Sequence, residues 1–93
     1  MSCVVLIPGA LRELADNRSQ VPLDGRAASI GDALSLLWNE CPGVRDRVLT
    51  ELGDVRPHVN IFVDGENIRY AGGMSAPLRE GSEIMIVPAV SGG

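Results

Sequence analysis

The residues with the clearest chemical potential are the last two, Gly92 and Gly93, which follow closely on an apolar run. Glycine loses more backbone freedom than other residues when it is fixed, so a turn is the usual reason for placing it. A terminal pair has no turn to make. Either this end has no role, or the terminal carboxylate is the working group. A carboxylate with a pKa of about 3.3–3.7 is ionised and unreactive at neutral pH. It becomes an acyl donor only when a partner attaches a leaving group, as adenylation with ATP does.

Side chains that could form a conventional active site are few and scattered. His58 is the single histidine, and no serine or cysteine nucleophile lies near it in the sequence, so we interpret it as structural. Gly9, Gly25 and Gly31 are isolated and match neither a dinucleotide-binding nor a phosphate-binding loop. The Gly72-Gly73 pair indicates a turn. The sequence therefore predicts no catalytic residue.

The two cysteines, Cys3 and Cys41, are too few and too far apart for a zinc or iron–sulfur site, which normally uses closely spaced pairs. Both lie among apolar residues, which indicates small core side chains, although one disulfide is conceivable. We expect no metal ligands in this chain.

Composition narrows the class of protein further. The chain has 93 residues, enough for one domain, and 45% of them are hydrophobic. The net charge is -4 and every basic residue is arginine, which argues against nucleic-acid binding and favours partners with basic patches. Codon bias is one interpretation of the absence of lysine, and the other is that it removes the side-chain amines that could attack an activated C-terminus. Residues 1–8 lack a signal peptide's features and no apolar stretch is long enough to span a membrane, so we expect a cytoplasmic protein.

The elements that must position the C-terminus begin with two predicted strands. Cys3–Ile7 is a short β-branched run that ends at Pro8. Arg18–Leu23 is a weaker strand, and its Pro22 indicates a sheet edge or the end of the strand. The turn-like residues 15–19 between them predict a β-hairpin.

The strongest local pattern predicts a helix. Ser29 is a candidate N-cap, and Asp32 lies three residues later, where a capping box has its acidic member. Pro42-Gly43 should end the helix, and a second apolar set after it predicts a shorter helix or turn. The apolar face of the first helix is Ile30, Leu34, Leu37, Trp38 and Cys41, and the second set is Val44, Val48 and Leu52.

The second half of the chain again predicts strands. His58–Val63 leads into Asp64-Gly65, a strong hairpin signal, and then into the short segment 66–70. Glu80-Gly81 predicts another turn before the last strand, Glu83–Pro88. We therefore expect an α+β fold, with a mixed sheet of four to five strands packed on one main helix. Residues 1–88 would form the domain, and residues 89–93 a flexible tail.

Alternation along the last strands predicts which side chains face the helix. Ile84 and Ile86 share one face, and Met85 and Val87 share the other. In the preceding strand Phe62 points the same way as Met85. If the helix covers one face only, Phe62, Met85 and Val87 form an exposed apolar patch, which is a candidate partner-binding surface. Partial burial under a loop is the alternative.

The residues between Pro88 and the C-terminus predict a narrow extension. Ala89, Val90, Ser91 and Gly92 with Gly93 span up to about 17 Å at roughly 3.3 Å per residue. Two residues without side chains would keep its end thin enough to enter a channel in another protein.

Two stretches, VNIFVDGENIRYAGG at 59–73 and LREGSEIMIVPAVSGG at 78–93, resemble the second half of the ubiquitin-like sulfur carriers of the ThiS/MoaD family. Within that family the chain most resembles the CysO branch. Ile7-Pro8 and the helix from Ile30 to Trp38 fit the same alignment, whereas the first hairpin matches loosely. The resemblance therefore covers nearly the whole chain.

The resemblance implies a β-grasp fold and a carrier rather than an enzyme. It implies that an E1-like enzyme adenylates Gly93 with ATP and converts it to a thiocarboxylate, while this chain binds no cofactor itself. In the CysO branch the sulfur acceptor partner resembles a pyridoxal-phosphate cysteine synthase, and a zinc metalloprotease then releases cysteine.

Several alternatives stay open. The same tail serves molybdopterin synthesis in the MoaD branch and the thiamin thiazole in the ThiS branch, and similar carriers feed sulfur into secondary metabolites. A different class is a β-grasp interaction module that transfers no sulfur.

Overall fold

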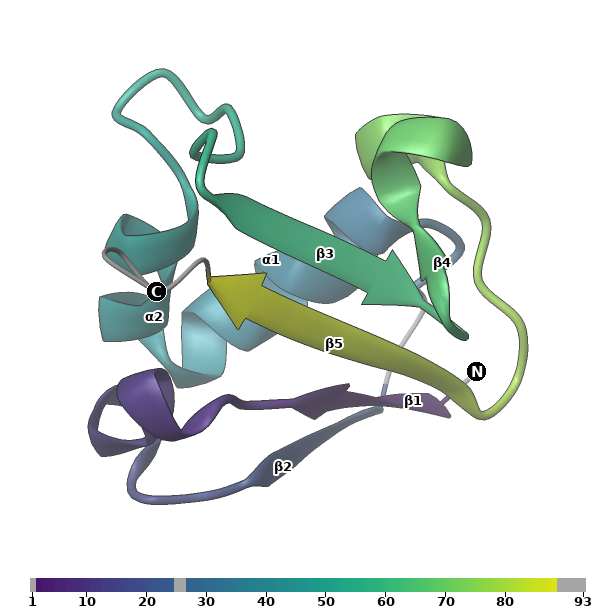
Figure 1. Ribbon diagram of the computed structural model, residues 1–93. Helices are drawn as coiled ribbons and strands as arrows, with labels where there is room; N and C mark the ends of the chain where they lie inside the picture. Colours follow the sequence, from purple (N-terminus) through teal and green to yellow (C-terminus); the bar gives the residue numbers. More distant parts are fainter. Residues whose placement is uncertain (1, 25–26, 89–93) are drawn as a thin grey trace.

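The chain folds around one mixed five-stranded sheet. The computed structural model describes residues 2–24 and 27–88 (Figure 1). The strands lie in the order β2-β1-β5-β3-β4, so the last strand of the sequence occupies the centre. Their bounds are β1 Ser2–Leu6, β2 Gln20–Asp24, β3 Val59–Val63, β4 Glu66–Asn67 and β5 Ser82–Pro88.

The central position of β5 comes from its pairing with both halves of the chain. It runs parallel to β1, with Leu6 opposite Met85, and antiparallel to β3, with Val59 opposite Pro88. The tight turn at Asp64-Gly65 then joins β3 to β4, as predicted, with both residues at positive φ. Strand β5 is therefore flanked on both sides at Ile84 and Met85, and its last residues up to Pro88 are held by β3 alone.

One main helix covers one face of this sheet. Helix α1 spans Ile30–Glu40, and the Ser29 hydroxyl caps it by accepting a hydrogen bond from the Asp32 N–H at 3.3 Å. The Asp32 carboxylate accepts from the Ala28 N–H, one residue earlier than in a regular capping box. Helix α2, Pro42–Val48, follows after Cys41, so Pro42-Gly43 ends one helix and begins the next.

The core lies between α1 and the inner face of the sheet. Its largest fully buried side chains come from strands and helices alike, and both cysteines are buried and free, as predicted. The α+β prediction is thus confirmed, with five strands. The side chains at the centre of the core are Val5, Val21, Ile30, Leu34, Leu37, Ile61, Ile84 and Ile86.

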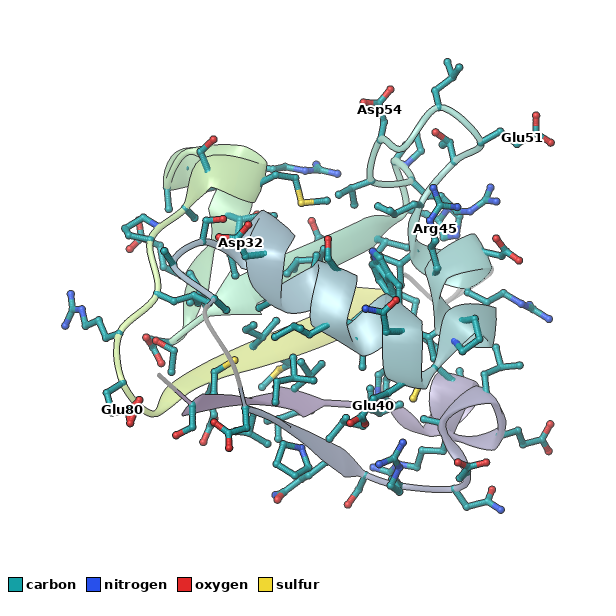
Figure 2. All side chains as sticks on the ribbon, turned by 180° about the vertical axis from the view of Figure 1, so that it is seen from behind. Asp32, Glu40, Arg45, Glu51, Asp54 and Glu80 are labelled. Carbon is teal, nitrogen blue, oxygen red and sulfur yellow. The ribbon has the colours of Figure 1, made fainter. Side chains whose placement is uncertain are left out.

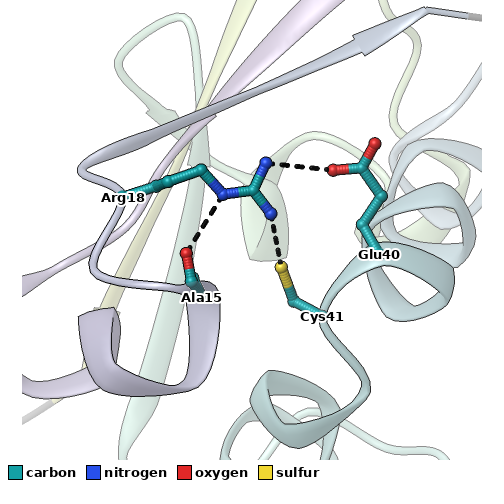
Figure 3. Close-up of polar contacts among 4 residues, drawn as sticks. All are labelled: Ala15, Arg18, Glu40 and Cys41. Carbon is teal, nitrogen blue, oxygen red and sulfur yellow. Dashed lines mark hydrogen bonds and ion pairs between the residues drawn. The ribbon is translucent and has the colours of Figure 1, made fainter.

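The predicted first hairpin is wrong in its connection. Strands β1 and β2 do pair antiparallel, and β2 carries Pro22 on the sheet edge, but a 3₁₀ helix (η1, Gly9–Ala15) lies between them. Arg18 lies in the connection and does not belong to β2. Its guanidinium donates to the Ala15 carbonyl at 3.1 Å and to Cys41 Sγ at 3.3 Å, and it lies 3.4 Å from a Glu40 carboxylate oxygen (Figure 3). Arg18 therefore ties this connection to the end of α1.

Two further expectations need correction. Segment 66–70 is a strand only at Glu66–Asn67, and Ile68–Tyr70 forms a 3₁₀ turn (η2) that buries Ile68 against the core. Leu52 does not pack with Val44 and Val48, since 89% of its surface is exposed at a loop tip. A further 3₁₀ turn, Gly73–Ser75 (η3), follows Gly72, whose φ of 108° confirms the predicted turn role of the glycine pair.

Candidate functional site

The sheet face that α1 does not cover is the candidate functional surface, and Figure 1 views the molecule from this side. Strand β5 alternates strictly along its length, with Ile84 and Ile86 buried and Glu83, Met85 and Val87 exposed. The predicted assignment of faces along β5 is therefore confirmed. We call the surface formed by Leu6, Phe62, Met85 and Val87 the open face.

The register of the sheet brings three of the open-face side chains into one row, whereas Val87 lies opposite Asn60. Met85 lies opposite Leu6 on β1 and opposite Phe62 on β3. The row continues to Gln20 on β2 and Asn67 on β4, so it crosses all five strands. Asn67 Nδ2 donates to Asn60 Oδ1 at 3.2 Å, which gives the apolar centre a polar border on the β4 side. Sequence reasoning missed Leu6, although the same period-2 alternation in the first strand could have found it.

Met85 separates two hollows on this face. The first, of about 550 Å³, is apolar and lies where β5 continues beyond β1; its lining includes Leu6, Pro8, Gln20, Met85 and Val87. The second, of about 580 Å³, is more polar and is lined by Phe62, Asp64, Gly65, Gly81, Glu83 and Met85. Met85 is 42% exposed, and its unbranched thioether side chain adapts readily to a partner surface.

The second hollow is acidic, and hydrogen bonds fix the Asp64-Gly65 turn that lines it to the start of β5. One Asp64 carboxylate oxygen accepts from the Glu83 N–H and the other from the Ser82 hydroxyl, both at 2.9 Å. The hydrogen bond from the Glu83 N–H, followed by that from Ser82, holds the pKa of Asp64 below its ordinary value. Asp64 and Glu83 therefore place negative charge beside Phe62 and Met85, where a basic group on a partner would fit.

The other end of β5 leads to the C-terminal residues. After Leu6 the continued register would bring Pro8 beside Val87, but proline has no N–H to donate to the ladder. Strand β5 thus continues to Pro88 with only β3 beside it, where Val59 is its partner. Gly93 and the tail residues Ala89, Val90, Ser91 and Gly92 lie outside the described residues, so their predicted roles stay predictions.

The described side chains offer no reactive group near this surface. Burial raises the pKa of the Cys3 thiol, which keeps it protonated at neutral pH, and Cys41 is buried under Arg18. His58 is exposed just before β3. Within residues 2–24 and 27–88, no cluster of three or more histidine, cysteine or acidic residues could hold a metal ion. What the arrangement offers is a contact surface beside the root of the C-terminal segment.

A central last strand, one main helix on one sheet face and an open opposite face are the ubiquitin-like β-grasp arrangement, and solved structures confirm this class. SAMP1 from Haloferax volcanii superposes with a TM-score of 0.86 at 29% identity, covering 100% of both chains. CysO in the BexX/CysO complex of Amycolatopsis orientalis also gives 0.86, at 26% identity, covering 98% of this chain and 99% of that one.

The chain belongs to the ThiS family, whose family model matches residues 5–93. Sulfur carrier protein CysO of Mycobacterium tuberculosis is 30% identical over 95 residues, which cover 100% of both chains. Small archaeal modifier protein 3 of Haloferax volcanii is 35% identical over 66 residues, 71% of each chain. These relatives are named as a sulfur carrier and a modifier, and this chain belongs with such small carrier proteins rather than with enzymes. No helix within the described residues is long and apolar enough to cross a membrane.

Proposed function

We propose that this protein carries sulfur as a thiocarboxylate on Gly93. The observation that carries the proposal is that the ThiS family match runs to the last residue and so includes the Gly92-Gly93 end. An E1-like enzyme adenylates the Gly93 carboxylate with ATP, and a sulfur donor then displaces AMP. The product keeps one oxygen and gains one sulfur at the terminal carbon.

The chemistry of the chain suits this role. A thiocarboxylate is ionised at neutral pH and is a soft nucleophile, so a protein can deliver sulfur without releasing sulfide. The chain contains no lysine. Its activated terminus therefore meets no side-chain amine of its own that could attack the acyl carbon before sulfur does.

In this proposal the chain binds no cofactor, and ATP is used by the activating partner in the cytoplasm. The open face docks on that partner and on the enzyme that accepts the sulfur. Leu6, Phe62, Met85 and Val87 supply the apolar contact, and the anchored β5 directs the tail into the partner's active site. Two residues without side chains at the tip allow a narrow channel.

For the sulfur acceptor we propose cysteine synthesis, because the relative named CysO matches over the full chain. A cysteine synthase-like enzyme with pyridoxal phosphate would take up the sulfur, and a zinc metalloprotease would release the cysteine. The alternative acceptors are another sulfur-containing metabolite, molybdopterin and the thiamin thiazole, and each would take sulfur from the same thiocarboxylate.

A second candidate function is protein modification through the same activated glycine. It is favoured by the similarity to small archaeal modifier proteins 1 and 3. A modifier passes its acyl carbon to an amine of a target, whereas a carrier passes only the sulfur. The two functions therefore leave different products. A modifier ends as a covalent conjugate with its target, whereas a carrier ends with its carboxylate restored and the sulfur in a small molecule.

The deciding experiment is intact-mass analysis after incubation with the cognate E1-like enzyme, ATP and a sulfur donor. We expect one oxygen to be replaced by sulfur at the C-terminus. If a carrier of proven activity is converted under the same conditions and this chain is not, the proposal is wrong.

Deletion of Gly93 is the matched variant. Because Gly93 lies five residues beyond the described part of β5, we expect the deletion to leave the far-ultraviolet spectrum and the unfolding midpoint unchanged. Sulfur loading should be abolished, because the terminal glycine is the acceptor. Continued loading of this variant would place the acceptor at another residue.

A further inference from the structure

A basic hollow lies beside the root of the C-terminal segment, on the opposite end of the sheet from Asp64. It has a volume of about 370 Å³ and is lined by Asp46, Arg47, Arg56 and His58. Asp46 and Arg47 belong to α2, whereas Arg56 and His58 lie in the loop that leads into β3. Since Val59 pairs with Pro88, this hollow lies next to the point where the described part of β5 ends.

Arg56 is fixed in this hollow by its neighbours. Its Nε donates to the Asp46 carbonyl at 3.0 Å, and its backbone N–H donates to the Val48 carbonyl at 2.9 Å. Its carbonyl accepts from the Val59 N–H at 2.9 Å. The Nε bond orients the guanidinium and the two backbone bonds fix the residue, while the terminal guanidinium nitrogens have no acceptor among the described residues. Arg56 is therefore preorganised to bind an external anion.

The acidic residues nearby leave the hollow positively charged. The Asp46 carboxylate lies 3.8 Å from the guanidinium of Arg45, which precedes it in the chain. Arg47, which follows Asp46, makes no side-chain hydrogen bond with the described residues. Glu51 and Asp54 lie at the outer end of the adjoining loop, away from the body of the molecule (Figure 2). Two arginines and one carboxylate, which lies 3.8 Å from Arg45, thus line the hollow in a chain with a net charge of -4.

The position of the hollow decides which anion it meets. Five residues from 89 to 93 span up to about 17 Å when a partner threads them into its active site. The phosphates of a nucleotide that reacts at Gly93 would then lie that far from Pro88, out of reach of Arg56. The group that faces the hollow is therefore on the partner's surface, around the opening that admits the tail. On a protein surface, the anions that arginine binds in bidentate geometry are carboxylates.

We propose that Arg47 and Arg56, with His58, form a second docking site that binds acidic side chains at the entrance of the E1-like enzyme's tail channel. This inference rests on the proposed function. The apolar open face supplies contact area, and the basic hollow sets the direction of approach, so that the tail arrives at the channel. Charge at an interface border acts chiefly on association and its dependence on salt.

The test compares Arg47→Glu, Arg56→Glu and the double variant with Arg79→Glu, which reverses an exposed charge at the far end of β5. The measurements are affinity for the cognate E1-like enzyme, and kcat and KM for its activation of this chain at low and high salt. We expect the double variant to raise KM and Kd about tenfold or more at low salt, with kcat unchanged. Added salt should narrow this difference in KM and Kd. Arg79→Glu adds negative charge near the already acidic Asp64 hollow and should therefore raise neither KM nor Kd.

Arg47→Glu tests the charge without disturbing the hydrogen bonds that fix Arg56. Arg47 is exposed and makes no side-chain hydrogen bond with the described residues. Unchanged KM and Kd in both this variant and the double variant would overturn the inference while leaving sulfur carriage standing. An equal loss in Arg79→Glu would overturn it too, because the effect would then come from net charge. If the native chain is not activated at all, the proposed function fails, and this inference fails with it.

Discussion

At the scale of single residues, Asp64 shows how one side chain can hold the turn beside a functional surface. It adopts a φ of 50°, a region that aspartate and asparagine tolerate better than most residues. Its carboxylate accepts hydrogen bonds from Glu83 and Ser82, which join the β3–β4 turn to the start of β5. Since these bonds favour the ionised form, the folded state binds a proton at Asp64 less readily than the unfolded chain does.

This linkage predicts that Asp64→Asn lowers the free energy of unfolding by an amount that depends on pH. Asparagine keeps the shape and the positive φ but lacks the charge. The native chain should be more stable near pH 7, by less than about 1 kcal/mol, because Asp64 is exposed to solvent. Its advantage should fade as the pH falls below about 3.9, through the lowered pKa of the folded state. Urea unfolding across this range measures the difference, and a constant difference would exclude the carboxylate charge as its cause.

At the scale of elements, β5 performs two tasks with alternate residues. Ile84 and Ile86 fill the core, whereas Met85 and Val87 remain exposed on the open face. Its parallel pairing with β1 and antiparallel pairing with β3 anchor it on both sides. The same strand therefore stabilises the fold and presents the proposed contact surface, and substitutions can change the two separately.

Two neighbouring truncations should separate these tasks. Ile84→Ala leaves a cavity in the core and should lower the free energy of unfolding by about 2–5 kcal/mol. Met85→Ala removes an exposed side chain and should lower it by less than about 1 kcal/mol. Denaturant titration of both variants checks the assignment, and equal losses would contradict the orientation of β5.

At the scale of the whole molecule, the two ends of the surface around β5 differ in charge. Asp64 and Glu83 lie beside the acidic hollow, and Arg47 and Arg56 lie beside the basic one near Pro88. The apolar open face lies on the sheet between them. A partner that matches this arrangement can bind in one orientation only, because the reversed orientation places like charges together.

The open face predicts a loss of partner binding in a variant that still folds, although the half-buried Phe62 also contributes to the free energy of unfolding. Phe62→Ser with Met85→Ser should raise KM for activation by the E1-like enzyme about tenfold or more, because buried aromatic and methionine contacts dominate such interfaces. Tyr70→Ser is the matched control, since Tyr70 is 83% exposed but lines neither hollow of the open face. Unchanged kinetics in the double variant would exclude the open face as the docking surface.

Local patterns in the sequence predicted most of the fold. The Ser29 cap, the apolar face of α1 and the Asp64-Gly65 turn depend on neighbours within a few residues, so they could be found without tertiary information. The 3₁₀ helix at Gly9–Ala15 could not, because Leu11 and Ala15 are held there by burial against distant parts of the chain. The prediction that Leu52 packs with Val44 and Val48 was wrong because the helical spacing of apolar residues continues in the sequence beyond Val48, where α2 ends.

The sequence by itself determined the alternation that exposes Met85 and Val87, and the terminal glycine pair on which the proposed chemistry rests, since both follow from residue type and order. Only the tertiary structure decided that Leu6 joins Met85 and Phe62 in one row, and that Arg56 and Asp46 meet beside Pro88. The physical reason is that strand register and loop closure bring together residues far apart in the chain. The pattern of side chains within one segment does not specify which distant segment it pairs with.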